Sequence, residues 1–242
     1  MKARWSALGL WLALWGCGGG TDPVQELSRD LSQYPEFSLL LDDLRVEDGF
    51  FPDCYLRFKA VTASGQRVDG RDTLVYEERQ TAEYKVSRDV FARYEHHLGM
   101  VVASKTLDGR ATDSRQAYPP GYQYVGNPQY GHWNSAGIWE FLGPYMLMQQ
   151  MMGGWRVNQA DYGEFRRAGE RGRPYYGPVR EGRTAFGTGG SLTEKARPEF
   201  YQRQVRRLGA NRKAFAAKSA NRMGRGTGTW GRGFSRLGGR RR

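Results

Sequence analysis

Charge divides this chain of 242 residues into two parts, and the division limits how much of it can form a packed core. Residues 1–160 contain 16 Lys and Arg against 19 Asp and Glu, whereas residues 161–242 contain 21 against 6. The second part is rich in glycine and arginine, a composition that buries too little apolar area to offset the entropy lost on folding. We therefore expect a globular domain over residues 22–155, followed by a basic, mostly disordered extension over residues 156–242.

The hydrophobic pattern of the first part mixes helical and extended periods. Apolar and polar residues alternate, as they do in half-buried strands, over residues 37–41 and 54–61, and residues 73–79 and 100–106 are two further strand candidates. Asp22 followed by Pro23 is typical of a helix start, and a second helix is expected to begin at Ser87 and to end at Gly99. Helices mixed with antiparallel strands predict an α+β domain.

The first seventeen residues form a segment of their own. Lys2 and Arg4 precede an apolar stretch over residues 5–15, which is too short to span a membrane. The following Leu14-Trp15-Gly16-Cys17 resembles the lipobox of bacterial lipoprotein precursors.

That resemblance implies that residues 1–16 are a signal peptide and that Cys17 carries a diacylglycerol group with a further acyl chain such as palmitate. Residues 17–21 are then a short tether to a membrane of the cell envelope. Because no Asp follows Cys17, the resemblance favours the outer membrane over the inner one.

An aromatic segment rich in Gly and Pro lies between residues 118 and 155. Its rings either stack on a ligand or pack against the sheet, since each ring buries a large area and the glycines permit tight turns. We take four residues of this segment as a candidate ligand-stacking loop: Tyr122, Tyr124, Tyr130 and Trp133.

The extension contains one stretch that differs from its surroundings. Residues 198–222 are good helix formers with a loose apolar side and predict a basic helix. Seven cations of the extension are our candidates for binding an anionic lipid or envelope polymer: Arg206, Arg207, Arg212, Lys213, Arg240, Arg241 and Arg242.

The residue types that most often perform chemistry show no known arrangement in the sequence. The adjacent His96 and His97 point about 100° apart on a helix, and His132 is isolated, so we predict neither a metal site nor a catalytic residue, and no cofactor. Cys54 lies on the apolar side of its strand and is expected to be buried.

These patterns favour a non-enzymatic binding or structural role at the envelope surface. The alternative is an enzyme or binding module that acts on a cell-wall or surface polysaccharide, which would require His132 and a pair of acids to meet in a cleft. An RNA-binding role would require that Cys17 stay unprocessed, so we do not expect nucleic acid to be a partner.

Overall fold

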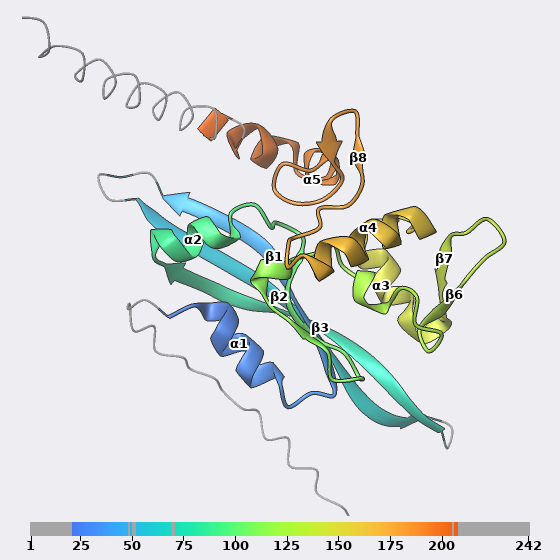
Figure 1. Cartoon of the computed structure of the whole chain (residues 1–242). Coiled ribbons are helices and arrows are strands. Elements are labelled where there is room, and N and C mark those ends of the chain that lie inside the picture. Colours follow the sequence, from blue (N-terminus) through green and yellow to red (C-terminus); the bar gives the residue numbers. More distant parts are fainter. Residues whose placement is uncertain (1–20, 48, 50–51, 69–70, 205, 208–242) are drawn as a thin grey trace, which may run out of the picture.

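The computed structural model describes residues 21–47, 49, 52–68, 71–204, 206 and 207. Within this part, an antiparallel sheet of five strands lies at the centre, in the order β3-β2-β1-β4-β5 (Figure 1). The strands are β1 (Glu36–Glu47), β2 (Asp53–Val68), β3 (Arg71–Val86), β4 (Val101–Lys105) and β5 (Ala111–Thr112). Each predicted strand is present, and β3 extends well beyond the predicted residues 73–79.

The first face of the sheet is covered by α1 (Pro23–Leu31) and α2 (Arg88–Tyr94). Both helices begin as the sequence predicts: the Asp22 carboxylate accepts from the Val24 N–H, and the Ser87 hydroxyl accepts from the Val90 N–H. Their apolar sides pack on the odd-numbered residues of the first half of β1, because successive strand residues point to opposite faces. Cys54 is buried in this cluster, as expected.

The second face is covered by the aromatic segment. It follows η1 (Ser114–Gln116) and contains η2 (Tyr122–Tyr124), β6 (Gly131–Trp133), β7 (Trp139–Phe141), η3 (Gly143–Tyr145) and α3 (Met146–Met151). Short turns alternate with buried rings, so the segment forms a dense aromatic layer over the sheet.

Packed structure continues past residue 155, where we expected the domain to end. The following elements are α4 (Gln159–Glu170), β8 (Val179–Arg180), β9 (Arg183–Thr184) and α5 (Ser191–Ala196). Val157, Tyr175 and Phe186 are buried in the same clusters as the aromatic segment. The predicted boundary is therefore wrong, because a few well-spaced apolar residues are enough to bury a polar stretch on an existing core.

The described part of the predicted helix over 198–222 is helical at residues 198–204, 206 and 207. The rest of that prediction lies outside the described residues.

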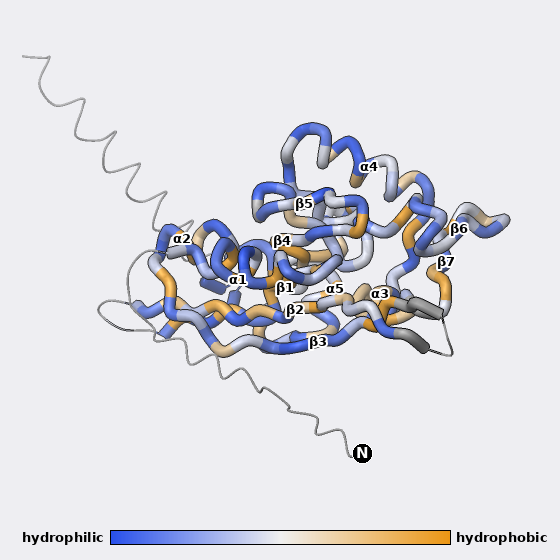
Figure 2. Tube along the Cα trace, turned by 90° about the horizontal axis from the view of Figure 1, so that it is seen from below, coloured by the Kyte–Doolittle hydropathy of each residue, from blue (hydrophilic) through white to orange (hydrophobic). Residues whose placement is uncertain are grey.

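Apolar residues concentrate along β1, β2 and β4, and hydrophilic residues dominate α4 and the outer surface (Figure 2). The fold is α+β, as the sequence predicts.

Candidate functional site

A cavity of about 330 Å³ opens between the β8–β9 hairpin and α5, and we call it the Trp155 cavity. Its apolar lining comes from Trp155, Pro178 and Ala185. Its polar lining consists of Arg180, Glu181, Arg183, Ser191, Glu194 and Lys195. An aromatic ring surrounded by charged and hydroxyl groups is a chemistry suited to polar ligands with one apolar face.

The charged residues of this cavity differ in how well they are neutralised. Arg183 donates to Glu194 at 2.6 Å, and the charges of these two residues neutralise each other. Arg180 and Lys195 have no ion-pair partner among the residues that the structure describes. The guanidinium of Arg180 lies over the Trp155 ring, 4.9 Å from the ring centroid, a cation–π arrangement.

The β8–β9 hairpin places Arg180 and Arg183 directly opposite each other at its turn. The two turn residues, Glu181 and Gly182, have φ values of 51° and 73°. Such a pair of left-handed residues is the usual way to close a two-residue hairpin. The sequence Arg-Glu-Gly-Arg thus brings two arginines to one side of a small cavity.

Behind Trp155 lies a group of buried polar atoms. Phe186 packs edge-on against Trp155 with ring centroids 5.8 Å apart, and Tyr122 and Tyr175 lie further inside. The Trp155 Nε1, both tyrosine hydroxyls and Asp161 Oδ2 are buried and make no hydrogen bond. Burial raises the pKa of the Asp161 carboxyl, and the positive charge of Arg180 opposes that rise.

A second cavity, of about 240 Å³, lies against the second face of the sheet. We call it the sheet cavity, and its apolar lining includes Leu40, Leu98, Met151, Met152, Phe186 and Leu192. Asp42, Lys59 and Arg197 also line it.

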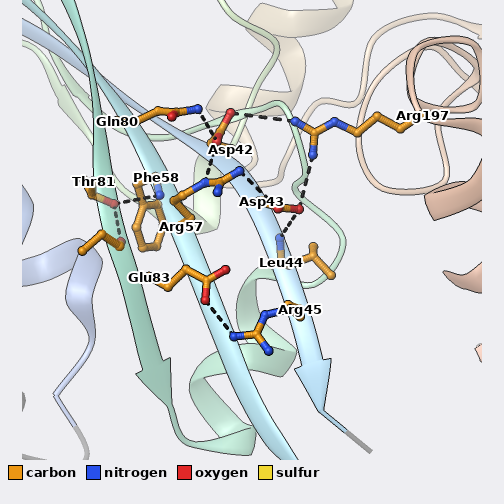
Figure 3. A network of polar contacts seen from close by, with 11 residues as sticks. Asp42, Asp43, Leu44, Arg45, Arg57, Phe58, Gln80, Thr81, Glu83 and Arg197 are labelled. Carbon is orange, nitrogen blue, oxygen red and sulfur yellow. Dashed lines mark hydrogen bonds and ion pairs between the residues drawn. The ribbon is translucent and has the colours of Figure 1, made fainter.

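The charges beside the sheet cavity neutralise one another. Asp42 accepts from Arg57 at 3.0 Å and from Gln80 at 3.0 Å, and Arg197 reaches both Asp42 and Asp43 (Figure 3). Lys59 is likewise paired, with Glu78 at 2.6 Å. These ion pairs bind the chain after α5 to β1, and we interpret them as a structural network.

A buried carboxyl lies beneath the aromatic segment. Glu36 is fully buried, and Tyr76 and Tyr130 donate to its Oε2 at 3.2 and 3.4 Å. Burial raises the pKa of Glu36, while the tyrosine hydrogen bonds lower it by a smaller amount. Neither cavity is lined by Glu36, so we assign it no ligand.

The candidate ligand-stacking loop is corrected by the structure. Tyr122, Tyr124 and Tyr130 are at most 2% exposed, so their rings are part of the core and have no face left for a ligand. The alternative, packing against the sheet, is the correct one for these three. Trp133 is half-buried against Trp139, with ring centroids 5.1 Å apart, and its stacking role stays a prediction.

The histidines do not meet in one site. His132 lies exposed on β6 near Glu140, at 3.6 Å, and His96 is exposed after α2. His97 stacks on Tyr176 and is buried, and burial lowers its pKa to about 4. Neither described cavity is lined by a histidine, and no group of His, Cys, Asp and Glu in the described part could hold a metal ion.

Two of the seven candidate cations are described. Arg206 is exposed, and the Arg207 guanidinium lies 5.7 Å from the ring centroid of Phe91 in α2. Cys17, Arg212, Lys213, Arg240, Arg241 and Arg242 lie outside the described residues. In the described part, no helix is long and apolar enough to cross a membrane.

Sequence reasoning missed Trp155, Arg180 and Lys195. The one local signal is the Glu-Gly turn between Arg180 and Arg183, because it predicts a hairpin that brings the two arginines together. Their proximity to Trp155 depends on packing that no local pattern encodes. No family model, curated protein or solved structure matches this chain.

Proposed function

We propose that this protein is a lipid-anchored component of the bacterial cell envelope with a non-enzymatic binding or structural role. In this proposal, acyl chains on Cys17 hold the domain on a membrane, and the outer membrane is favoured. Two or three acyl chains suffice for stable anchoring, because each buried methylene contributes about 0.8 kcal/mol.

The lipobox-like Leu14-Trp15-Gly16-Cys17 carries the proposal, and the attachment of Asp22 to the domain decides which side of the domain an anchor at Cys17 would hold near a membrane. Asp22 is 7% exposed, and the Tyr94 hydroxyl donates to both of its carboxylate oxygens, at 2.9 and 2.8 Å. Arg93 forms an ion pair with the same carboxylate. Asp22 is therefore fixed to α2 by a buried, charged hydrogen-bond network.

This attachment limits the distance between the domain and the membrane. Five residue steps separate Cys17 from Asp22, and at about 3.6 Å per residue they span at most about 18 Å. A tether this short holds α2 close to the bilayer surface, whatever its conformation. The α2 side of the domain would then face the membrane.

The other end of the described chain reaches the same helix. Phe200 packs against the cluster that contains α2, and Arg207 covers Phe91. Arg88 and Arg203 are exposed, as is Arg206. Beyond residue 207 the sequence contains ten Lys and Arg and no Asp or Glu. An anionic lipid or envelope polymer at this surface is the partner that such charges fit.

A pair of cysteine variants tests the anchor. Cys17→Ser removes the acceptor for the lipid, and we expect an unprocessed or soluble protein that leaves the detergent phase. Cys54→Ser is the matched control, because Cys54 is buried in the domain, and it should keep the mass and partitioning of the wild type. Intact mass spectrometry of membrane-extracted protein reports cleavage and acylation together. A processed Cys17→Ser protein that still enters the detergent phase would rule out the anchor.

A further inference from the structure

We propose that the Trp155 cavity binds an acidic saccharide, whose carboxylate or phosphate group is recognised by Arg180 and Lys195. The inference deepens the binding role proposed above and rests on it only for the natural source of the ligand, an acidic glycan of the envelope.

Recognition of the acidic group rests on how Arg180 is held. The guanidinium carbon of Arg180 lies 4.9 Å from the centroid of the Trp155 ring, and this cation–π contact holds the guanidinium at the cavity. A pre-oriented guanidinium binds the two oxygens of a carboxylate or phosphate at once, with little further loss of side-chain entropy. Lys195 lines the same cavity and supplies a second positive charge.

Local charge favours an anion over a cation. Arg183 and Glu194 neutralise each other, and Glu181 offsets one of the two remaining cations. The cavity lining therefore has one positive charge in excess. Asp161 does not line the cavity, and burial raises its pKa, while the charge of Arg180 opposes that rise.

The remaining lining suits the body of a sugar. Pro178, Ala185 and the part of Trp155 that Arg180 does not cover offer apolar surface to the C–H groups of a pyranose ring. Ser191 and Glu194 offer hydrogen-bond partners to its hydroxyl groups. A volume of about 330 Å³ exceeds what one phosphate ion fills and lies at the small end of ligand sites. An acidic monosaccharide unit fits both the size and the chemistry.

The test is titration calorimetry on the full chain with glucuronate and glucose 6-phosphate, and with glucose and inorganic phosphate as the neutral and sugar-free probes. We expect both acidic sugars to bind more tightly than either comparison probe, because only they engage the cations and the apolar lining together.

Two substitutions, each of which removes one positive charge, test whether the sugars bind in the cavity. Arg180→Gln should weaken binding of the acidic sugars roughly tenfold or more, the usual effect of losing a charge-assisted hydrogen-bond pair. Arg173→Gln removes the same charge from an exposed residue outside the cavity and should leave binding unchanged. Both residues are exposed, so thermal unfolding should show both variants folded.

Each of three outcomes would overturn the inference. They are no binding of either acidic sugar, equal binding of inorganic phosphate, and equal weakening by Arg173→Gln. The intact mass of the protein in the same sample shows separately whether Cys17 is acylated. If an unacylated protein binds the acidic sugars, the sugar site is supported and the anchor proposal is contradicted.

Discussion

At the scale of the residue, the most unusual group is the carboxyl of Glu36. It is fully buried, two tyrosines donate to one of its oxygens, and the other oxygen makes no hydrogen bond. Burial is the larger influence on its pKa, which is raised. The folded state therefore holds the proton more tightly than the unfolded chain, and ionisation of Glu36 works against folding.

Glu36→Gln should stabilise the protein at neutral pH and flatten its pH dependence. For a raised pKa, stability is fully present below the unfolded value of about 4.5 and is lost as pH rises through the folded value. Glutamine keeps an acceptor for Tyr76 and Tyr130 without the charge. Urea unfolding across a pH series measures the effect, with the exposed Glu77→Gln as control. A variant that is no more stable than the wild type at neutral pH would contradict the prediction.

His97 has the opposite dependence. Its pKa is lowered from 6.5 to about 4, chiefly by burial and then by the charge of His96. Between pH 6.5 and pH 4, His97 is protonated in the unfolded chain but stays neutral in the folded state. Its contribution to folding stability is therefore fully present above pH 6.5 and is lost as the pH falls toward 4.

The loss at the acid end is roughly 3 kcal/mol, and His97→Phe should remove it while keeping the stack on Tyr176. Thermal unfolding between pH 4 and 7 is the measurement, and the exposed His96→Phe is the control. If both variants lose stability below pH 6.5 as steeply as the wild type, another group controls the acid response.

At the scale of the element, two local features stand out: a bulge in β3 and a close backbone approach in the β6–β7 hairpin. β3, an edge strand of the sheet, carries a bulge where Thr81 accepts from the Phe58 N–H at 3.0 Å, and many of its side chains are charged. Bulges and charges of this kind discourage an edge from pairing with another chain.

The β6–β7 hairpin depends on the close approach of the Glu140 carbonyl oxygen and the Trp139 ring to the backbone of Gly131.

Gly131→Ala should destabilise the protein by on the order of 2–3 kcal/mol or more, because overpacking forces the backbone to move. An added Cβ would lie 2.2 Å from the Glu140 carbonyl oxygen and 2.8 Å from the Trp139 ring. Gly163→Ala in α4 is the matched control, since its nearest neighbour is 4.0 Å away, and a small gain is expected there. Chemical denaturation of both variants decides it. Equal stability would show that the hairpin moves freely.

At the scale of the whole molecule, the residues after 155 complete the core. Val157, Tyr175 and Phe186 are at most 7% exposed, and Phe165 packs edge-on against Tyr118 and Tyr122. The domain thus needs a part of the chain whose composition alone predicts disorder.

Ending the chain after residue 155 should therefore prevent stable folding, whereas ending it after residue 207 should not. The shorter fragment leaves the aromatic layer of the second face uncovered, and we expect it to aggregate and to lose near-ultraviolet circular dichroism. The longer fragment, residues 21–207, is the control. A cooperative thermal transition in the shorter fragment would restore the boundary at residue 155.

The sequence by itself determined the α+β class, four strands of the sheet, and the starts of α1 and α2 at Asp22 and Ser87. These features depend on local periodicity and on capping side chains, which neighbouring residues encode. The burial of Cys54 was equally predictable, because alternation along β2 places it beside apolar residues.

Only the tertiary structure decided which aromatic rings are core and which line a cavity. Tyr122 and Trp155 are both aromatic residues of the same segment. Tyr122 is fully buried in the core, whereas Trp155 lines the cavity. Composition also placed the domain boundary too early, since a few apolar residues at 157–186 find their partners only in the aromatic segment that covers the second face of the sheet. Long-range packing, which decides what each side chain meets, is the physical reason for both differences.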